Sequence, residues 1–374
     1  MQAKIKVSDL KSKSSVAVIG AGAVGSMTAF FLAKKGYKVC IIDPKINPEN
    51  NSAKSLTGSI ASLGVLMGNS FHRSKGRSWE LRQRSMKLWP DLIKEICVEN
   101  QCLKIDTPLI RFATNKEESI YMNSMCKERR HLGLEFFRNF PSEDIRKLFP
   151  NSKYGGTVSH FEGRLDPVKL LELLKYFLKY NKVEFINKKV KNIKRLSWED
   201  SQKWEIELED NEIIKKNTIV ICAALGTKNL VKSLGHEINL SPVLGQALEI
   251  EVEEDVYQNL SWPGVISFHG VNIIPNGRKR VLIGATLENN IQPDYLEKLK
   301  MLEMNKFAPR WIKEATIIKE WHGIRARPDN ESSPILKSLE KGLIINSGHY
   351  RNGILISPGC AEWVTKEISK ENHQ

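Results

Sequence analysis

The sequence lacks the cysteine patterns that hold metal ions or cross-link small secreted proteins. Its six cysteines among 374 residues include no CxxC pair and do not cluster with histidines. Closely spaced cysteine and histidine ligands mark zinc sites, and regularly spaced cysteines mark disulfide frameworks. We therefore expect reduced cysteines that serve packing, and no metal site, as is usual in the cytoplasm.

A long apolar run is absent as well. No segment approaches the roughly 20 apolar residues of a membrane-spanning helix, and residues 1–15 are basic and polar without the apolar centre of a signal peptide. The sequence also has no internal repeat and no low-complexity linker. Because 374 residues exceed the usual size of a single core, we expect a cytoplasmic protein with no membrane span and two interleaved domains.

Positive charge is abundant but dispersed. The formal net charge is +14, and the basic residues occur in short groups such as Lys188–Lys189 and Arg278–Arg280. Dispersed charge is typical of a solvated surface, which would steer anionic substrates inward. Nucleic-acid binding is the alternative, but the groups lack the interleaved aromatic residues of single-strand binders, so we expect no nucleic-acid partner.

Residues 14–44 have the pattern of a βαβ unit. Two continuously apolar segments, residues 16–19 and 39–42, predict parallel strands that are covered on both faces. Between them the apolar spacing is helical, and Gly36 follows two lysines where a helix commonly ends.

A glycine fingerprint opens this helix. Gly20, Gly22 and Gly25 form GxGxxG directly after the first strand, where backbone amides can receive a pyrophosphate. Asp43 ends the second strand, where a carboxylate can accept ribose hydroxyls. The pattern predicts a dinucleotide without choosing between NAD and FAD; the alternative is that the glycines serve only close packing.

The rest of the chain alternates between buried strands with helices and short antiparallel strands. Residues 166–180 predict a helix with Asp166 as its N-cap, and 218–226 and 341–348 read as buried strands. Residues 182–217 predict a small antiparallel meander, 242–290 an antiparallel sheet with a turn at Asn276–Gly277, and 358–370 a final helix.

Several motifs resemble, in order and approximate spacing, the D-amino-acid oxidase family of flavoproteins. They are the GxGxxG motif with Asp43, SIASLGVLM, LDPVKL, ICAALG, SPVLGQ, VLIGATLE, HGIRARP and SGHYRNGILISP. The last motif is most similar to the glycine oxidases of thiamin biosynthesis. The resemblance runs from about residue 15 to 368. It implies noncovalently bound FAD, since no cysteine stands after HGIRARP at the position where related sarcosine oxidases attach their flavin.

The resemblance also implies which residues contact FAD. It assigns the flavin phosphate region to Gly58 and Ser59, the isoalloxazine ring to 63–65, the adenine end to Val190 and the pyrimidine side to 349–355. Residues 57–67, taken alone, are equally an ordinary loop. The predicted FAD-binding residues are Gly20, Gly22, Ala23, Val24, Gly25, Asp43, Pro44, Gly58, Ser59, Leu63, Gly64, Val65, Val190, Ala223, Gly226, His349, Tyr350, Arg351, Asn352, Gly353, Ile354 and Leu355.

Three residues are predicted to contact the substrate: Arg325, Arg351 and Asn272. Arg325 matches the arginine that binds the substrate carboxylate in glycine oxidases, and a guanidinium suits two carboxylate oxygens. Arg351 would add positive charge beside the reduced flavin. A salt-bridging or surface role is the alternative for both arginines, and Arg327 is a second candidate. Asn272 stands where glycine oxidases have a tyrosine.

The fold class predicted is α/β: a Rossmann-like FAD-binding domain of glutathione-reductase type with an interleaved α+β substrate domain on an antiparallel sheet. We expect residues 1–88, 159–238 and 323–374 in the first domain, and 89–158 and 239–322 in the second.

The function predicted is oxidation of a small amino acid, glycine or a relative, with oxygen as acceptor. Another amine (sarcosine, proline or a D-amino acid), a quinone acceptor, and a non-catalytic flavin- or nucleic-acid-binding protein are the alternatives. The sequence leaves homo-oligomerisation open.

Overall fold

The computed structural model describes residues 13–46, 55–98, 102–197, 202–254, 256 and 263–371. The expectation that residues 1–15 carry no signal peptide therefore falls mostly outside the described part of the chain. Within that part, no helix combines the length and the apolar character needed to cross a bilayer.

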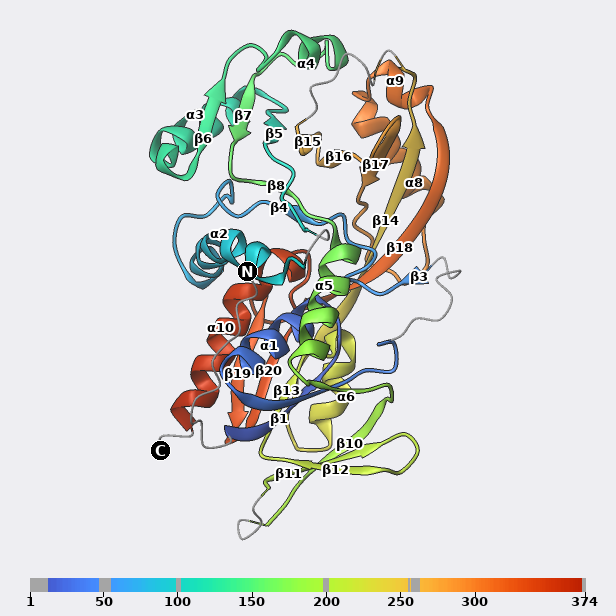
Figure 1. Ribbon diagram of the computed structural model, residues 1–374. Helices are drawn as coiled ribbons and strands as arrows, with labels where there is room; N and C mark the ends of the chain where they lie inside the picture. Colours follow the sequence, from blue (N-terminus) through green and yellow to red (C-terminus); the bar gives the residue numbers. More distant parts are fainter. Residues whose placement is uncertain are drawn as a thin grey trace.

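The predicted βαβ unit lies at the centre of a six-stranded sheet in the lower half of the molecule (Figure 1). Strand β1 pairs in parallel with β13 on one side and with β2 on the other. Only β19, at one edge, runs antiparallel to its neighbour β20. The strands, in sheet order, are β19 (Ile335–Glu340), β20 (Leu343–Ser347), β13 (Thr218–Ile221), β1 (Lys13–Ile19), β2 (Tyr37–Ile42) and β9 (Glu184–Ile186).

Both faces of this sheet are covered, which explains its continuously apolar strands. Side chains from one face pack with four helices in a single core. The other face packs against a three-stranded antiparallel sheet and α6. The helices are α1 (Ala23–Lys34), α2 (Arg77–Ile96), α5 (Pro167–Tyr180) and α10 (Gly353–Glu371); the other layer contains β10 (Val190–Arg195), β11 (Trp204–Leu208), β12 (Ile213–Lys216) and α6 (Thr227–Lys232).

Several local predictions are confirmed. Asp166 caps α5 by accepting from the amides of Val168 and Lys169, and Gly36 follows α1 with a φ of 82°. The meander prediction is right for β10, β11 and β12, but it is wrong for residues 184–186. These residues form β9, which adds to β2 in parallel at the edge of the main sheet.

A nine-stranded sheet fills the upper half of the molecule (Figure 1). Two long strands, β14 and β18, pair antiparallel and run between the two halves, and β16 pairs with β17 across the predicted Asn276–Gly277 turn. In order, the strands are β3 (Ser55–Leu56), β18 (Thr316–Pro328), β14 (Leu240–Glu251), β17 (Arg280–Gly284), β16 (Val271–Pro275), β15 (Val265–Phe268), β5 (Leu109–Phe112), β7 (Gly156–Ser159) and β6 (Leu134–Phe137).

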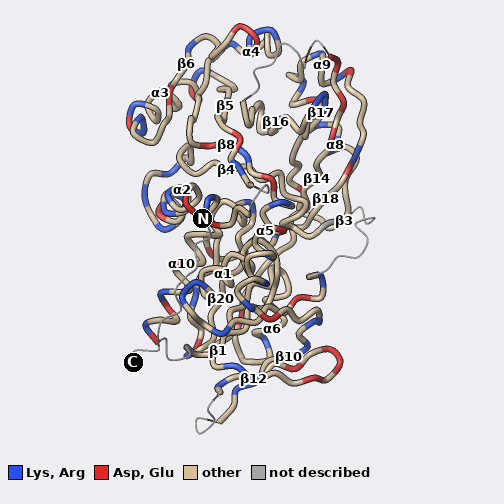
Figure 2. The backbone as a smooth tube through the Cα atoms, in the orientation of Figure 1, with Lys and Arg blue, Asp and Glu red and all other residues tan. Residues whose placement is uncertain are grey.

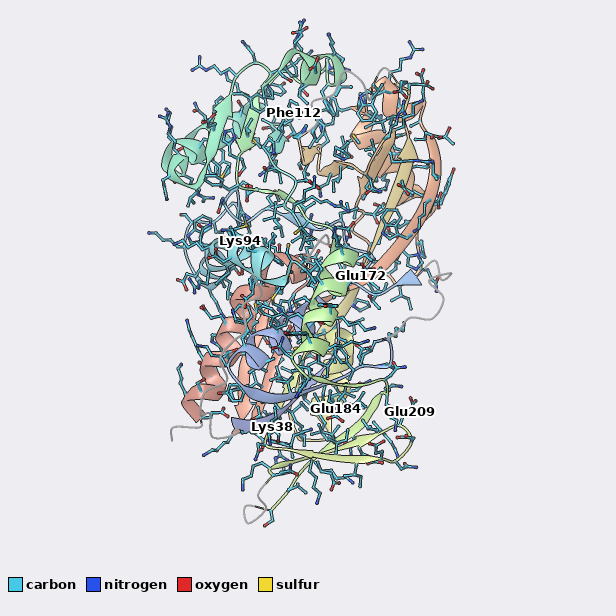
Figure 3. The ribbon with its side chains drawn as sticks, in the orientation of Figure 1. Lys38, Lys94, Phe112, Glu172, Glu184 and Glu209 are labelled. Atoms are coloured by element: carbon cyan, nitrogen blue, oxygen red, sulfur yellow. The ribbon has the colours of Figure 1, made fainter. Side chains whose placement is uncertain are left out.

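This sheet has an aromatic core of its own. Phe112, labelled in Figure 3, contacts the rings of Phe149 and Phe268 at centroid distances of 5.4 and 5.7 Å. Short helices cover the sheet, and a two-stranded ribbon lies between the halves. The helices and turns are α3 (Lys116–Glu128), α4 (Glu143–Leu148), α8 (Tyr295–Glu303), α9 (Arg310–Lys313) and the 3₁₀ turns Arg130–Leu132 and Met304–Lys306. The ribbon pairs β4 (Val65–Leu66) with β8 (Gly163–Arg164), and a further 3₁₀ turn, Ala224–Gly226, connects β13 to α6 in the other half.

The final helix begins earlier than predicted. Helix α10 starts at Gly353, not at residue 358, and Pro358 lies inside it. A proline has no amide hydrogen to donate to the carbonyl four residues before it. Here that carbonyl, of Ile354, accepts instead from the Ser357 hydroxyl at 2.9 Å. The helix therefore continues through Pro358, and its amino-terminal end lies within the glycine-rich motif itself.

Candidate functional site

One large cavity lies where the two halves of the molecule meet. Its volume is about 1880 Å³, and its lining comes from the carboxyl ends of β1, β2 and β13, from β14, β16 and β18, and from the start of α10. The cavity therefore brings together the glycine fingerprint and the arginine motif, which are more than 300 residues apart in the sequence. A cavity this size can accommodate a dinucleotide together with a small substrate.

The fingerprint glycines leave no room for side chains. A β-carbon added at Gly20 would lie 2.5 Å from the Cys222 carbonyl oxygen, and one at Gly25 would lie 1.8 Å from the Gly20 carbonyl oxygen. At the start of α1, the Ser59 hydroxyl accepts from the Ala23 amide at 2.9 Å. Strand, helix and the Ser59 segment thus meet at a helix amino terminus, which suits a pyrophosphate.

Asp43 is held at the end of β2 by backbone amides. Its Oδ2 accepts from the Ala21 amide at 2.8 Å, and its Oδ1 accepts from the Lys45 amide at 2.7 Å. The carboxylate keeps further lone pairs for ribose hydroxyls. Pro44 and Val190 line the same end of the cavity, as expected for residues near an adenosine.

The segment predicted to contact the isoalloxazine ring is fixed from behind. Gly64 has a φ of 75°, and a β-carbon there would lie 1.9 Å from the Leu165 carbonyl oxygen. The Leu165 amide donates to the Gly64 carbonyl at 3.0 Å, and Arg164 Nε donates to the Leu63 carbonyl at 3.4 Å. Only glycine therefore fits at position 64.

His349 carries a buried nitrogen with no hydrogen-bond partner. The side chain is buried beside the cavity, its Nε2 is unpartnered, and burial lowers its pKa to about 3. A buried, unsatisfied polar atom normally has a partner in the working protein. Together with the glycine contacts, it shows that the residues present fit a flavin dinucleotide.

Arg325 lies flat against the backbone of β14. Its Nη1 donates to the carbonyl oxygens of Leu244, at 3.1 Å, and Thr286, at 3.0 Å. A β-carbon at Gly245 would lie only 2.0 Å from its Nη2, so Gly245 makes room for the guanidinium. Burial lowers the pKa of Arg325, and the nearby charge of Arg351 lowers it further. Arg327 instead donates to Asn289 Oδ1 and does not line the cavity.

Sequence reasoning missed the residues that fix Arg325. Gly245 is one; the signal was a glycine inside a buried strand, which marks a close approach. Glu288 is another: it is 4% exposed and accepts from Gln246 Nε2 at 2.9 Å and from the Asp294 amide at 2.8 Å. The Thr286 hydroxyl also donates to it. This network orders the carbonyl that binds Arg325, and Glu288 supplies a negative charge nearby.

Nearly all of the predicted site residues line this cavity. Asn272 reaches it from β16, and Arg351 from the turn before α10, where Tyr350 has a φ of 54°. Two of the predicted residues, Ala23 and Gly25, do not line it. Those that do are Gly20, Gly22, Val24, Asp43, Pro44, Gly58, Ser59, Leu63, Gly64, Val65, Val190, Ala223, Gly226, Asn272, Arg325, His349, Tyr350, Arg351, Asn352, Gly353, Ile354 and Leu355.

Known proteins of similar sequence are glycine oxidases at low identity. The chain is 21% identical to glycine oxidase of Geobacillus kaustophilus over 92% of this chain and 89% of that enzyme. It is 28% identical to glycine oxidase of Pseudomonas putida, but that alignment covers only 41% of this chain and 42% of that enzyme.

Solved structures share the fold. Glycine oxidase of Bacillus cereus superposes with a TM-score of 0.78 at 22% identity, covering 96% of this chain and 95% of that one. Iminodiacetate oxidase of Chelativorans sp. BNC1 and L-proline dehydrogenase of P. horikoshii each superpose with a TM-score of 0.76 at 18% identity. They cover 95% and 96% of this chain, and 95% and 94% of their own chains.

The family model described as FAD dependent oxidoreductase (DAO) matches residues 15–367, nearly the whole chain. This match confirms the resemblance to the D-amino-acid oxidase family, the α/β fold class and FAD as the cofactor. The cavity brings together the fingerprint glycines, the buried His349 and Arg325. The chain belongs to the DAO family of FAD-dependent oxidoreductases.

Proposed function

We propose that this protein is an FAD-dependent oxidase of a small amino acid, glycine or a close relative. The amino acid would be converted to its imine, and hydrolysis would then give an oxo acid and ammonia. Oxygen would take the electrons and form hydrogen peroxide. The observation that carries the proposal is the half-buried guanidinium of Arg325, which lines the same cavity as the glycine fingerprint and residues 63–65.

Arg325 has the chemistry that a substrate carboxylate requires. Nη1 is occupied by two main-chain carbonyls, which fixes the plane of the guanidinium and leaves Nη2 and Nε to bind two oxygens. A partly desolvated cation gains more from an anionic partner than an exposed one does. In this role Arg325 anchors the substrate, and Arg351 adds a second positive charge near it.

The protein's part in the reaction is mainly positioning. Bound FAD would accept the hydrogen of the α-carbon with its electron pair, and the residues around it orient the substrate. His349 is uncharged in the neutral range because burial lowers its pKa to about 3. His269 stacks on Phe307 at a centroid distance of 4.1 Å and does not line the cavity. Neither residue supplies a charged acid or base.

The residues predicted to contact FAD remain part of this proposal. The pyrophosphate would bind at Gly20–Gly25 and Ser59, the ribose at Asp43, and the flavin ring between 63–65 and 349–355. FAD would be noncovalent, so acid precipitation should release the yellow colour into the supernatant. Colour retained in the pellet would contradict noncovalent binding.

Spectroscopy tests directly which amine the protein oxidises. Glycine added anaerobically to the purified yellow protein should bleach the visible flavin band, and air should restore the band with formation of peroxide. Failure to bleach with glycine, sarcosine, proline and D-alanine would overturn the proposal. Bleaching without peroxide in air would indicate a dehydrogenase, the alternative favoured by the structural similarity to L-proline dehydrogenase.

A further inference from the structure

A basic segment follows the residues proposed to contact the flavin ring. Residues 67–73 continue from β4, and Phe71, His72 and Arg73 line the cavity. Their chain packs directly on helix α2: a β-carbon at Gly68 would lie 2.6 Å from the Met86 side chain and 3.5 Å from Arg82 Cβ. The segment therefore places Arg82 of α2 close behind the flavin site.

Arg82 is a buried cation without an acidic partner. The residue is only 6% exposed, lines the cavity, and has its guanidinium carbon 3.7 Å from the centre of the Phe71 ring. Its Nη1 donates to the Ser78 carbonyl at 2.8 Å, while its Nε has no partner. Within the described residues no carboxylate lies within 4 Å of it. Such a group is costly unless an anion binds it.

Neighbouring residues hold this segment in place without neutralising it. Arg129 is 5% exposed and donates to the carbonyl oxygens of Asn69, at 2.8 Å, and Arg73, at 3.2 Å. Glu162 accepts from the amides of Asn69 and Ser70, and burial raises its pKa, which favours the uncharged acid. Burial lowers the pKa of His72, and surrounding positive charges lower it further: those of Arg73, Arg82, Arg111 and Arg129.

The acidic side chains that line the cavity come from outside residues 67–82. They are Asp43, Glu172 and Glu209. Asp43 ends β2, and Figure 3 labels the other two, Glu172 on α5 and Glu209 beside the β10–β12 sheet. Around residues 67–82, by contrast, the lining contains only neutral and basic side chains. In this part of the cavity, no carboxylate from residues 67–82 neutralises the positive charge of Arg73 and Arg82.

We propose that the cavity takes an amino acid carrying a second anionic group, which binds to Arg82 and Arg73 while the α-carboxylate binds to Arg325. This inference rests on the proposed amino acid oxidase function and names its substrate class. Arg325 would bind the α-carboxylate, with the positive charge of Arg351 nearby. Arg82, already desolvated and stacked on Phe71, lines the cavity and would bind the second anion as a cation that lacks a carboxylate partner among the described residues.

Two substrates that differ by one carboxylate test the proposal. Iminodiacetate is sarcosine with a carboxylate on its N-methyl carbon. The holoenzyme should have a kcat/KM for iminodiacetate at least about tenfold above that for sarcosine, because a charged hydrogen bond contributes roughly 1.5–3 kcal/mol. An equal or lower value for iminodiacetate would overturn the inference.

Variants at Arg82 separate anion binding from packing. Arg82→Met keeps the aliphatic bulk and should abolish the preference, mainly through KM for iminodiacetate, with little change for sarcosine. Arg82→Lys should restore part of the preference. Arg84→Met is the matched control, since it removes the same charge two residues along α2, where Arg84 pairs with Glu362. Equal losses for both substrates, or loss of FAD in Arg82→Met, would overturn the inference.

A binding measurement keeps this test independent of turnover. If no amine reduces the flavin, the proposed function fails, but the anion site can still be measured. Glutarate and butyrate should then perturb the flavin spectrum of the holoenzyme, with glutarate binding at least about tenfold more tightly. Equal affinities in the unmodified protein, or an unchanged preference in Arg82→Met, would contradict the site.

Discussion

The two ends of the cavity are built in different ways. The dinucleotide end is formed mainly by consecutive residues: a strand, a glycine turn and a helix amino terminus within residues 16–34. Asp43 completes it. At the substrate end, Arg325 depends on partners from β14 and from the chain after β17, up to 81 residues away. The first site is local in sequence, and the second exists only in the fold.

The comparison predicts that damage to the dinucleotide end removes the cofactor. In Gly25→Val, the new side chain would collide with the Gly20 carbonyl, which lies 1.8 Å from the site of a β-carbon. The protein should be purified without yellow colour and should not bind added FAD, as titration would show.

The control for this variant is Gly235→Ala. Gly235 has a φ of 84° and no atoms near its β-carbon site, so alanine costs about 1 kcal/mol of stability but no contact. This variant should retain its FAD. A yellow Gly25→Val protein would show that FAD binding does not require the glycine fingerprint.

Damage to the substrate end should leave the cofactor in place. Arg325→Ala should lower kcat/KM for the amino acid by about 2–4 kcal/mol of transition-state binding, because a buried charged partner of the carboxylate is lost. The FAD content, read from the visible spectrum, should match that of the unmodified protein. Undiminished turnover would exclude Arg325 from substrate binding.

Substitution of Gly245 tests the placement of Arg325 through a residue that need not contact the substrate. Gly245→Ala places a methyl group where the guanidinium of Arg325 lies and should lower kcat/KM by about 1–3 kcal/mol. In an Arg325→Ala background the same substitution should have almost no further effect, since the two changes share one mechanism. Additive losses in the double variant would show that Gly245 acts elsewhere.

The smallest expected effect is a pH dependence of the free energy of unfolding that comes from His349. Its pKa is about 3 in the folded protein and about 6.5 when unfolded. Between these values the unfolded chain binds a proton that the folded chain does not. The free energy of unfolding therefore falls as the pH is lowered from 6.5 towards 3, by up to about 1.4 kcal/mol per pH unit.

The measurement is urea unfolding of the holoenzyme at pH 7 and pH 5. His349→Asn should reduce the difference between the two pH values, whereas replacement of the exposed His131 by asparagine should not. An unchanged difference in His349→Asn would mean that other groups govern the acid sensitivity.

The features that were predicted correctly from the sequence are those that depend on residues close together in the chain. The βαβ unit, the capped helix at Pro167–Tyr180 and the Asn276–Gly277 hairpin depend on neighbouring residues, and the structure contains them. One failure has a long-range cause. Residues 184–186 alternate like a meander strand, but their place is fixed by an open edge of β2.

The start of α10 was missed for a local reason. Proline is common at the first turn of a helix, so the sequence predicts a start at Pro358. In the structure, Ser357 satisfies the carbonyl that the proline leaves free, and the helix extends further back. Arg82 and Glu288 had no local signature, because charged residues are ordinary in any sequence and only burial distinguishes these two. The domain boundaries stay a prediction.

The central claim is that one cavity holds a flavin and an amino acid whose carboxylate binds to Arg325. It is tested most directly by the rate of anaerobic flavin reduction in a stopped-flow instrument, with FAD-loaded unmodified protein and FAD-loaded Arg325→Ala compared at equal amino acid concentrations. We expect rapid bleaching of the first and at least about thirtyfold slower bleaching of the second. Equal rates in the two proteins, or no bleaching of the unmodified protein by any amino acid, would contradict the claim.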